Sequence, residues 1–344
     1  MKGHKLTSVV WEITLDCNLE CIHCGSSAGA PRVEELTTEE GITLIYDLTE
    51  LDVKNICLMG GEPFLRKDWF KLANEVNELG VDVSFVSNGI LVEKMIEKLA
   101  SLDPLVVGIS LDGMKEVHNR IRGNHSWKHA IKALDLLASR EIEATVITTV
   151  SKINLKELPK IKQLLLGRDI GWQIQYALPM GRFWKKYVLS PEEYYALGIF
   201  MNSCRMKYTF DDLPVIGGHG SGYYSRFLHS LGYWQGCTAG IASLGIRSNG
   251  DITGCLTLPK EFDEENIRRK HIREIWEDEN AFAYTRKFKQ GQLGNNCRVC
   301  EFGRICKGGC SAPSIYFTGR FHNNPYCFRG IEKRNKIRFD SVSH

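Results

Sequence analysis

The chain has 344 residues, of which 43% are hydrophobic and 25% are charged, enough apolar material for one large domain and a smaller one. Its 44 basic and 41 acidic side chains give a formal net charge of +3, an excess too small to indicate a nucleic acid or an anionic membrane as partner. No segment approaches the ~20 consecutive apolar residues that span a bilayer, so we expect a cytoplasmic protein with no membrane partner.

The first half of the chain alternates short apolar runs with longer stretches of helical periodicity. Strands are predicted at residues 9–15, 55–60, 82–88, 104–111, 143–150 and 172–178. The first intervening helix begins with a capping box, Thr37-x-x-Glu40, and the second is predicted to end at Gly80. Apolar strands that alternate with helices indicate a parallel sheet covered by helices. Because six units are too few for a closed eight-unit barrel, we expect an α/β fold, a partial (β/α)6 TIM-like barrel.

This alternation stops near residue 182. The next 54 residues hold 13 aromatic residues and a glycine-rich stretch, GGHGSGYYSRF, and seven of the chain's cysteines follow. We therefore divide the chain into a barrel domain, an aromatic-rich bridging segment, a small cysteine-rich domain and a basic C-terminal tail, at residues 1–182, 183–236, 237–330 and 331–344.

Twelve cysteines are many for a reduced compartment, and ten of them fall into spaced groups, which indicates metal binding rather than disulfides. The other two are isolated. Cys57 lies in an apolar run and is expected to be a small buried hydrophobe. The residues around Cys204 do not indicate a role for it.

The first cysteine group, Cys17, Cys21 and Cys24, follows the first predicted strand. A structural zinc site needs four ligands, and His23 is poorly placed to be the fourth because it adjoins Cys24. A disulfide exchanger needs only a C-x-x-C pair. A [4Fe–4S] cluster held by three thiolates leaves one iron free, which could take the amino and carboxylate groups of S-adenosylmethionine (SAM). The group lies at the C-terminal end of the parallel strands, where such folds place their active sites.

C-x-x-x-C-x-x-C at this place resembles the radical SAM superfamily, with His23 in the aromatic position before the third cysteine. The segments MGGEP (59–63), SNG (87–89) and ISLDG (109–113) follow successive strands and resemble its SAM-binding segments, and LPMGR (178–182) resembles its closing segment near the adenine. The resemblance implies that Glu62 receives the methionyl ammonium beside Gly60 and Gly61. It also implies further SAM contacts from Ser87, Asn88, Ser110, Asp112 and Arg122.

The later cysteines have the spacing C-x17-C, then C-x2-C-x5-C-x3-C, then C, which resembles the SPASM domain of radical enzymes that modify peptides and proteins. The resemblance implies two auxiliary [4Fe–4S] clusters. The first takes Cys237, Cys255 and Cys310, and the second takes Cys297, Cys300, Cys306 and Cys327. Two clusters have eight iron atoms, and these cysteines supply only seven thiolates. The fourth iron of the first cluster is therefore open, bound by a residue other than cysteine, or bound by Cys204. Read alone, the spacing also suits a pair of zinc knuckles.

The expected cofactors are therefore three [4Fe–4S] clusters and SAM. We expect an enzyme that cleaves SAM reductively and oxidises or crosslinks a peptide or protein side chain, with a flavodoxin- or ferredoxin-type electron donor. The first strand begins near residue 9 without a leader-binding segment before it, so a separate leader-peptide-recognition protein is a further expected partner. The alternatives are a tetrapyrrole or other small metabolite as substrate, and an iron–sulfur electron carrier without enzymatic activity. His219 and Tyr223 are candidate catalytic residues in the glycine-rich stretch.

Overall fold

The computed structural model describes residues 4–218 and 224–335, and its centre is one ten-stranded sheet. The six predicted strands are present and neighbour one another in chain order, each parallel to the next. Their bounds are β1 (Ser8–Thr14), β2 (Asn55–Gly60), β3 (Asp82–Ser87), β4 (Val106–Ser110), β5 (Ala144–Val150) and β6 (Gly171–Tyr176). The predicted α/β partial barrel is confirmed.

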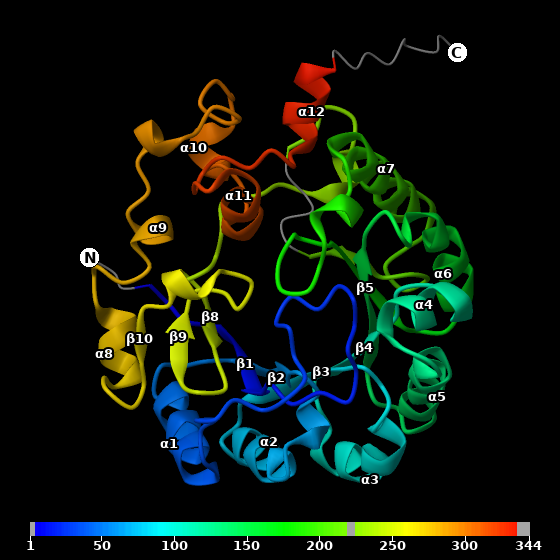
Figure 1. Ribbon diagram of the computed structural model, residues 1–344, viewed down its shortest axis with the longest axis vertical. Coiled ribbons are helices and arrows are strands. Elements are labelled where there is room, and N and C mark those ends of the chain that lie inside the picture. Colours follow the sequence, from blue (N-terminus) through cyan, green and yellow to red (C-terminus); the bar gives the residue numbers. More distant parts are fainter. Residues whose placement is uncertain (1–3, 219–223, 336–344) are drawn as a thin grey trace.

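Six helices follow the outer side of this curved sheet (Figure 1). They are α1 (Thr38–Thr49), α2 (Trp69–Glu78), α3 (Val92–Leu102), α4 (Lys115–Arg122), α5 (Ser126–Ser139) and α6 (Leu158–Leu165). The predicted capping box is formed, because the Thr37 hydroxyl accepts from the Glu40 amide at 3.2 Å and the Glu40 carboxylate accepts from the Thr37 amide at 2.8 Å. Gly80 follows α2 with φ +72°, the left-handed conformation that commonly ends a helix.

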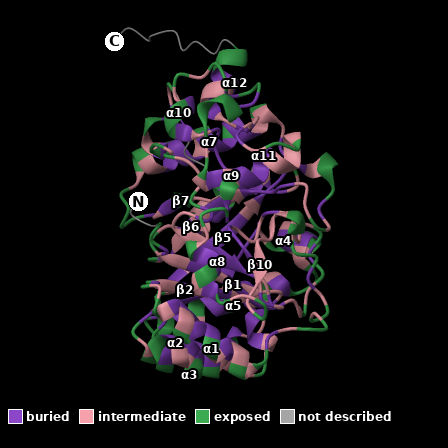
Figure 2. Cartoon of the chain, turned by 90° about the vertical axis from the view of Figure 1, so that its left-hand side faces the viewer, coloured by how far each residue is buried: buried purple, intermediate pink, exposed green. Residues whose placement is uncertain are grey.

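The core lies between the sheet and these helices, and Figure 2 colours its buried residues purple. Val9, Trp11 and Ile13 of β1 are fully buried. Trp11 approaches α1 closely, since a Cβ added at Gly41 would lie 3.1 Å from the Trp11 ring. Burial of one such large side chain contributes roughly 1.5–3 kcal/mol to folding.

The sheet continues past the six predicted strands at both edges. After α7 (Pro191–Lys207), β7 (Val215–Gly217) pairs parallel with β6, while β8 (Ser243–Ile246) pairs parallel with β1. The hairpin partners β9 (Asp251–Thr253) and β10 (Glu265–Asn266) extend the second edge. These strands are two to four residues long, too short for an alternating pattern to be visible in the sequence. Both the bridging segment and the cysteine-rich domain thus contribute strands to the barrel sheet.

The remaining C-terminal part is built from short helices, of which the last three lie above the barrel in Figure 1, while the first lies beside α1. They are α8 (Ile272–Glu277), α9 (Ala283–Arg286), α10 (Gly303–Cys306), α11 (Ser311–Thr318) and α12 (Phe328–Arg334). Single 3-10 turns occur at Pro63–Leu65, Leu155–Glu157, Lys185–Tyr187, His229–Leu231, Lys260–Phe262 and Gln290–Gln292. Within the described ranges, no helix has the length and hydrophobicity needed to cross a bilayer.

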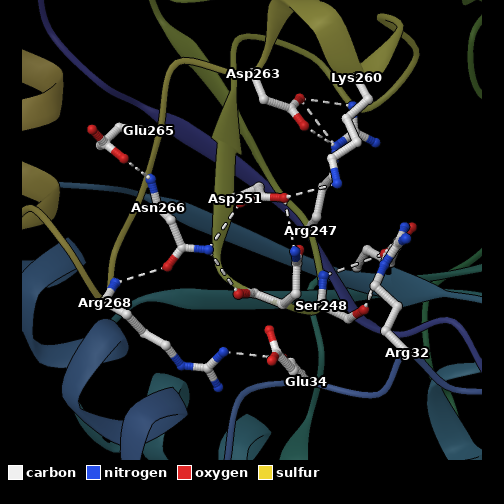
Figure 3. A network of polar contacts seen from close by, with 12 residues as sticks. Arg32, Glu34, Arg247, Ser248, Asp251, Lys260, Asp263, Glu265, Asn266 and Arg268 are labelled. Atoms are coloured by element: carbon white, nitrogen blue, oxygen red, sulfur yellow. Dashed lines mark hydrogen bonds and ion pairs between the residues drawn. The ribbon is translucent and has the colours of Figure 1, made fainter.

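A polar network joins the β8–β10 region to the barrel (Figure 3). The buried Glu12 carboxylate on β1 accepts from Arg32 at 2.9 and 3.1 Å and from the Ser248 amide at 3.2 Å. Arg247 forms a forked ion pair with Asp263 at 2.8 Å, which fixes the end of β8 against the loop after β9. Because Arg32 belongs to the loop after β1, the network ties the cysteine-rich part to the loop that carries the first cysteine group.

Candidate cluster and cofactor site

The first three cysteines lie in the loop that follows β1, at the C-terminal ends of the parallel strands. Backbone bonds shape this loop, from the Cys17 amide to the Gly29 carbonyl at 2.9 Å and from the Cys24 amide to the Cys21 carbonyl at 3.2 Å. The pKa of the Cys17 thiol is raised to about 11, mainly by burial and to a smaller extent by the charges of Glu62, Cys21 and Cys24. The structure therefore brings the three predicted thiols together.

The segment after β6 closes over this loop. The Arg182 side chain donates to the Cys21 carbonyl at 3.2 Å and to the Ala28 carbonyl at 2.6 Å, and its amide donates to the Cys24 carbonyl at 3.0 Å. Gly181 has φ +55°, and a Cβ there would lie 2.3 Å from the Cys24 carbonyl oxygen. The LPMGR segment thus holds the cysteine loop through the Arg182 guanidinium, which bridges the Cys21 and Ala28 carbonyls.

Gly60 and Gly61 also meet this loop. Gly60 has φ +154°, and a Cβ on it would stand 2.0 Å from the Thr14 carbonyl oxygen, while one on Gly61 would stand 2.1 Å from that of Asp16. Only glycine allows the end of β2 to approach the start of the cysteine loop so closely. The absence of side chains thus serves the fold of the loop as well as the approach of a ligand.

Three predicted SAM contacts, Glu62, Ser87 and Asn88, converge where β2 and β3 end. The Glu62 carboxylate is fully buried and accepts from the Ser87 hydroxyl at 2.9 Å and from the Asn88 amide at 2.8 Å. The Asn88 side chain donates to Asn18 in the cysteine loop at 2.7 Å. Burial outweighs these bonds and raises the pKa of Glu62 to about 7. A cation bound beside this carboxylate would stabilise its charged form.

A second polar cluster lies beyond β4, around the fully buried Asp112. Its carboxylate meets His23 Nε2 at 2.7 Å and Arg122 Nε at 2.5 Å, and it accepts from the Thr149 amide at 2.9 Å. Burial alone would raise the pKa of Asp112, but Arg122 and His23 outweigh it and hold that pKa far below its usual range. Asp112 is thus a carboxylate that fixes Arg122 and His23 beside the cysteine loop, and Ser110 lies buried at the end of the same strand.

The His118 imidazole supports this cluster by a hydrogen bond with the Asp112 backbone. Its Nδ1 accepts from the Asp112 amide at 3.1 Å, and burial lowers the pKa of His118 to about 3, so the ring is neutral near pH 7. The role of His118 could not be predicted from the sequence, because a lone histidine on a helix carries no signal of the strand end that it faces.

Four of the later cysteines line a single pocket together with glycines of the same region. The pocket contains Cys297, Cys300, Cys306 and Cys327, beside Gly303, Gly308, Gly309 and Gly330. The pKa of Cys297 is raised to about 12, mainly by burial and also by the charge of Cys327. This is the set that the resemblance implies for the second auxiliary cluster, and glycine lining leaves the space between the thiols open.

The other three, Cys237, Cys255 and Cys310, form a separate group. The Cys310 thiol donates to Cys237 and lowers its pKa, and Cys255 contacts the Thr257 hydroxyl at 3.4 Å. Cys204 lies on α7, where burial raises its thiol pKa and the charge of Lys162 on α6 opposes the rise. Among the described residues, no cysteine contributes to the pKa of the Cys204 thiol. The position of Cys204 therefore does not support it as a ligand of the first auxiliary cluster.

The donor sets suit iron–sulfur clusters. One set of three thiols faces the polar strand ends, and sets of three and four lie in the C-terminal part, which is the thiolate chemistry that [4Fe–4S] clusters use. Within the described residues, no group of three or more histidine, cysteine or acidic side chains is arranged to hold a single metal ion. His219 and Tyr223 lie outside the described residues.

A partial α/β barrel with such a site defines a class of enzymes that use an iron–sulfur cluster at the strand ends. Residues 11–165 match the family model of the Radical SAM superfamily, and residues 237–301 match that of SPASM, an iron–sulfur cluster-binding domain. The chain is a radical SAM superfamily enzyme with a C-terminal SPASM domain, and its cofactors are SAM and iron–sulfur clusters. The expected family is confirmed, in preference to a zinc-binding protein or an electron carrier without enzymatic activity.

The chain is similar to relatives with different substrates. It is 28% identical to the AdoMet-dependent heme synthase of Methanosarcina barkeri, over 93% of this chain and 95% of that protein. It is also 28% identical to the mycofactocin maturase MftC of Mycolicibacterium smegmatis, over 90% of this chain and 79% of that protein. The crystal structure of Streptococcus suis SuiB bound to S-adenosylmethionine shares the fold, with a TM-score of 0.73 and 18% identity over 94% of this chain and 76% of that one.

Proposed function

We propose that this enzyme oxidises or crosslinks a side chain of a peptide or protein by radical chemistry. When bound, the reduced cluster and SAM supply one-electron cleavage to methionine and a 5′-deoxyadenosyl radical, which abstracts a substrate hydrogen atom. The observation that carries the proposal is the set of Cys17, Cys21 and Cys24 at the strand ends, because three thiolates leave one iron for SAM.

The surrounding residues hold and orient these groups. Arg182 fixes the cysteine loop through the Cys21 and Ala28 carbonyls, and Glu62 offers its carboxylate to the methionyl ammonium. Arg122, already oriented by Asp112, offers a guanidinium to the methionyl carboxylate. Ser87, Asn88, Ser110 and His23 complete the proposed SAM contacts from the same strand ends.

Seven cysteines are proposed to hold two auxiliary clusters, as Cys237, Cys255 and Cys310, and as Cys297, Cys300, Cys306 and Cys327. An auxiliary cluster would accept an electron from the substrate radical, which favours net oxidation of the substrate over simple hydrogen transfer. A flavodoxin- or ferredoxin-type protein is the proposed electron donor, and a separate protein is proposed to recognise the leader of a peptide substrate.

Similarity to the maturase MftC over 90% of the chain supports a peptide substrate. The test is anaerobic incubation of the reconstituted enzyme with SAM, reductant and peptides encoded beside its gene. We expect 5′-deoxyadenosine together with a loss of two hydrogen masses from one peptide, and neither with the Cys17→Ala, Cys21→Ala, Cys24→Ala variant. Release of 5′-deoxyadenosine with every peptide unchanged would contradict the proposal.

A tetrapyrrole is the second candidate substrate, favoured by similarity to the heme synthase over 93% of this chain and 95% of that protein. It predicts that the protein binds an iron tetrapyrrole carrying propionate side chains and converts it without any peptide. Difference absorption spectroscopy and mass spectrometry distinguish the two candidate substrates. Loss of carboxylate carbon changes the mass of the pigment, whereas the masses of added peptides stay the same.

A further inference from the structure

Three buried tyrosine hydroxyls beside the auxiliary cysteines have no hydrogen-bond acceptor among the described residues. They are those of Tyr176 on β6, Tyr194 on α7 and Tyr284 on α9, and the three oxygen atoms are inaccessible to solvent. The charges of two or more auxiliary cysteines act on the hydroxyls of Tyr194 and Tyr284. An unsatisfied buried hydroxyl costs about 1–3 kcal/mol, so such a group is expected to have an acceptor in the complete protein.

The Tyr284 hydroxyl lies at the three-cysteine site. A Cβ added at Gly254, the residue before Cys255, would stand 2.2 Å from the Tyr284 oxygen. The same Cβ would stand 3.1 Å from the Ala239 carbonyl carbon, two residues after Cys237. The hydroxyl therefore sits where the segments that carry these two cysteines meet.

The nearest protein group leaves the Tyr284 proton without an acceptor. The Gly254 amide faces the phenol oxygen and acts on it as a hydrogen-bond donor. Since an amide N–H cannot accept, the phenol proton remains available. The ring is held by stacking on Phe321, with centroids 4.7 Å apart and planes 8° apart, so the hydroxyl cannot turn away to another group.

Tyr194 lies between the two groups of auxiliary cysteines. It is fully buried and stacks on Phe328, the residue after Cys327, with centroids 4.7 Å apart. The charges of Cys327, Cys310 and Cys306 all act on its hydroxyl. Cys310 belongs to the three-cysteine group and the other two to the four-cysteine group, so this hydroxyl lies near members of both groups.

We infer that the Tyr194 and Tyr284 hydroxyls donate hydrogen bonds to sulfur atoms of the auxiliary clusters and thereby raise their reduction potentials. The cysteines whose charges act on the two hydroxyls would supply the acceptor, as thiolate or as sulfide of the bound cluster. A hydrogen bond to sulfur stabilises the reduced cluster more than the oxidised one, because the reduced cluster carries one more negative charge. The inference rests on the auxiliary-cluster assignment under the proposed function, and it makes both tyrosines positioning residues rather than ligands.

The test is potentiometric titration followed by electron paramagnetic resonance, in a full-length Cys17→Ala, Cys21→Ala, Cys24→Ala background that leaves only the auxiliary clusters. Tyr284→Phe and Tyr194→Phe are each expected to lower the reduced-to-oxidised ratio at a fixed potential about tenfold, which is about 59 mV for a one-electron couple. Tyr284→Phe should affect one cluster, whereas Tyr194→Phe can affect either or both.

Tyr326→Phe is the matched control. Tyr326 directly precedes Cys327 and belongs to the same aromatic cluster as Tyr194, but its hydroxyl already donates to the Leu189 carbonyl at 2.6 Å. We expect its loss to change the ratio by less than about twofold. Electron–nuclear double resonance of the reduced auxiliary clusters needs no tyrosine variant, and it should show a proton coupling that disappears after exchange into deuterium oxide.

Unchanged potentials in both variants would overturn the inference, as would the absence of any exchangeable proton coupling at the clusters. Loss of one cluster's iron and sulfide in Tyr284→Phe would also overturn it, because Tyr284 would then be a ligand. A background protein that takes up no iron would contradict the cluster assignment itself, which separates failure of the assignment from failure of the hydrogen bonds.

Discussion

Glu62 has the most informative ionisation at the proposed SAM site. Its pKa is raised to about 7 by burial, whereas an unfolded glutamate titrates near 4.5. The folded protein therefore holds this proton more tightly, and the contribution of Glu62 to stability falls as pH rises from about 4.5 to about 7. A bound ammonium has the opposite effect, because it favours the ionised carboxylate.

We therefore predict that SAM binds more tightly as pH rises through 7, by up to about tenfold per pH unit below the pKa. In Glu62→Gln this dependence should be lost and binding should be weak at every pH. Equilibrium dialysis with labelled SAM at several pH values measures both effects. A wild-type affinity that is constant between pH 6 and 8 would show that Glu62 does not meet the ammonium.

Gly60 tests how closely β2 meets the cysteine loop. In Gly60→Ala the new Cβ would stand 2.0 Å from the Thr14 carbonyl oxygen, at φ +154°, so the backbone itself must move. We predict a loss of more than about 3 kcal/mol in the free energy of unfolding, measured by urea titration under anaerobic conditions. Gly29→Ala is the control in the same loop: no atom lies within 4 Å of its Cβ position, and we expect a change below about 1 kcal/mol.

At the scale of elements, Arg182 joins the segment after β6 to the loop after β1. Arg182→Ala removes bonds to the Cys21 and Ala28 carbonyls, so we predict that the first cluster is lost while the auxiliary clusters remain. Iron analysis should then show a loss of about a third of the iron, one cluster in three. Arg140→Ala is the control, because the side-chain partner of Arg140 in the described part of the chain is the exposed Glu97, and full iron content is expected for this variant.

The elements differ in how far the sequence predicts them. The six strands of the barrel are five to seven residues long and largely apolar, and they alternate with helical periodicity, so both their existence and their approximate ends can be predicted. This is why Cys17, Glu62 and Asp112 could be placed at one edge of the sheet. The strands β7 and β8 could not, because three or four residues pair with β6 and β1 only through the folded chain.

The same limit applies to the site. Motifs next to strand ends are visible in the sequence, whereas Arg182, Tyr194 and Tyr284 act at positions set by tertiary packing. A tyrosine in an aromatic-rich segment is usually a packing residue. Tyr194 differs from Tyr326 in that its hydroxyl has no hydrogen-bond partner among the described residues, and this difference has no sequence pattern.

At the scale of the whole molecule, the C-terminal part completes the barrel rather than standing apart from it. Residues Ser8 to Trp11 of β1 pair with Ser243 to Ile246 of β8, and Trp276 donates to the His4 carbonyl at 3.0 Å. The buried Glu12 takes its hydrogen bonds from both sides of this contact. The edges of the six-stranded sheet are thus covered by residues that follow the motifs of the radical SAM domain.

This arrangement predicts that a chain ending at Arg182 does not fold stably, although it contains every proposed ligand of the first cluster and of SAM. Without β7 and β8, the backbone groups of β6 and β1 become open edges, which favour edge-to-edge association of chains. We expect aggregation and no bound cluster, measured by size-exclusion chromatography and iron content after anaerobic reconstitution. A chain ending at Asn335 keeps both edge strands and all ten proposed cluster cysteines, and it should remain monodisperse with full iron content. A soluble, cluster-binding chain of residues 1–182 would show instead that the barrel is an independent folding unit, to which the C-terminal part is merely attached.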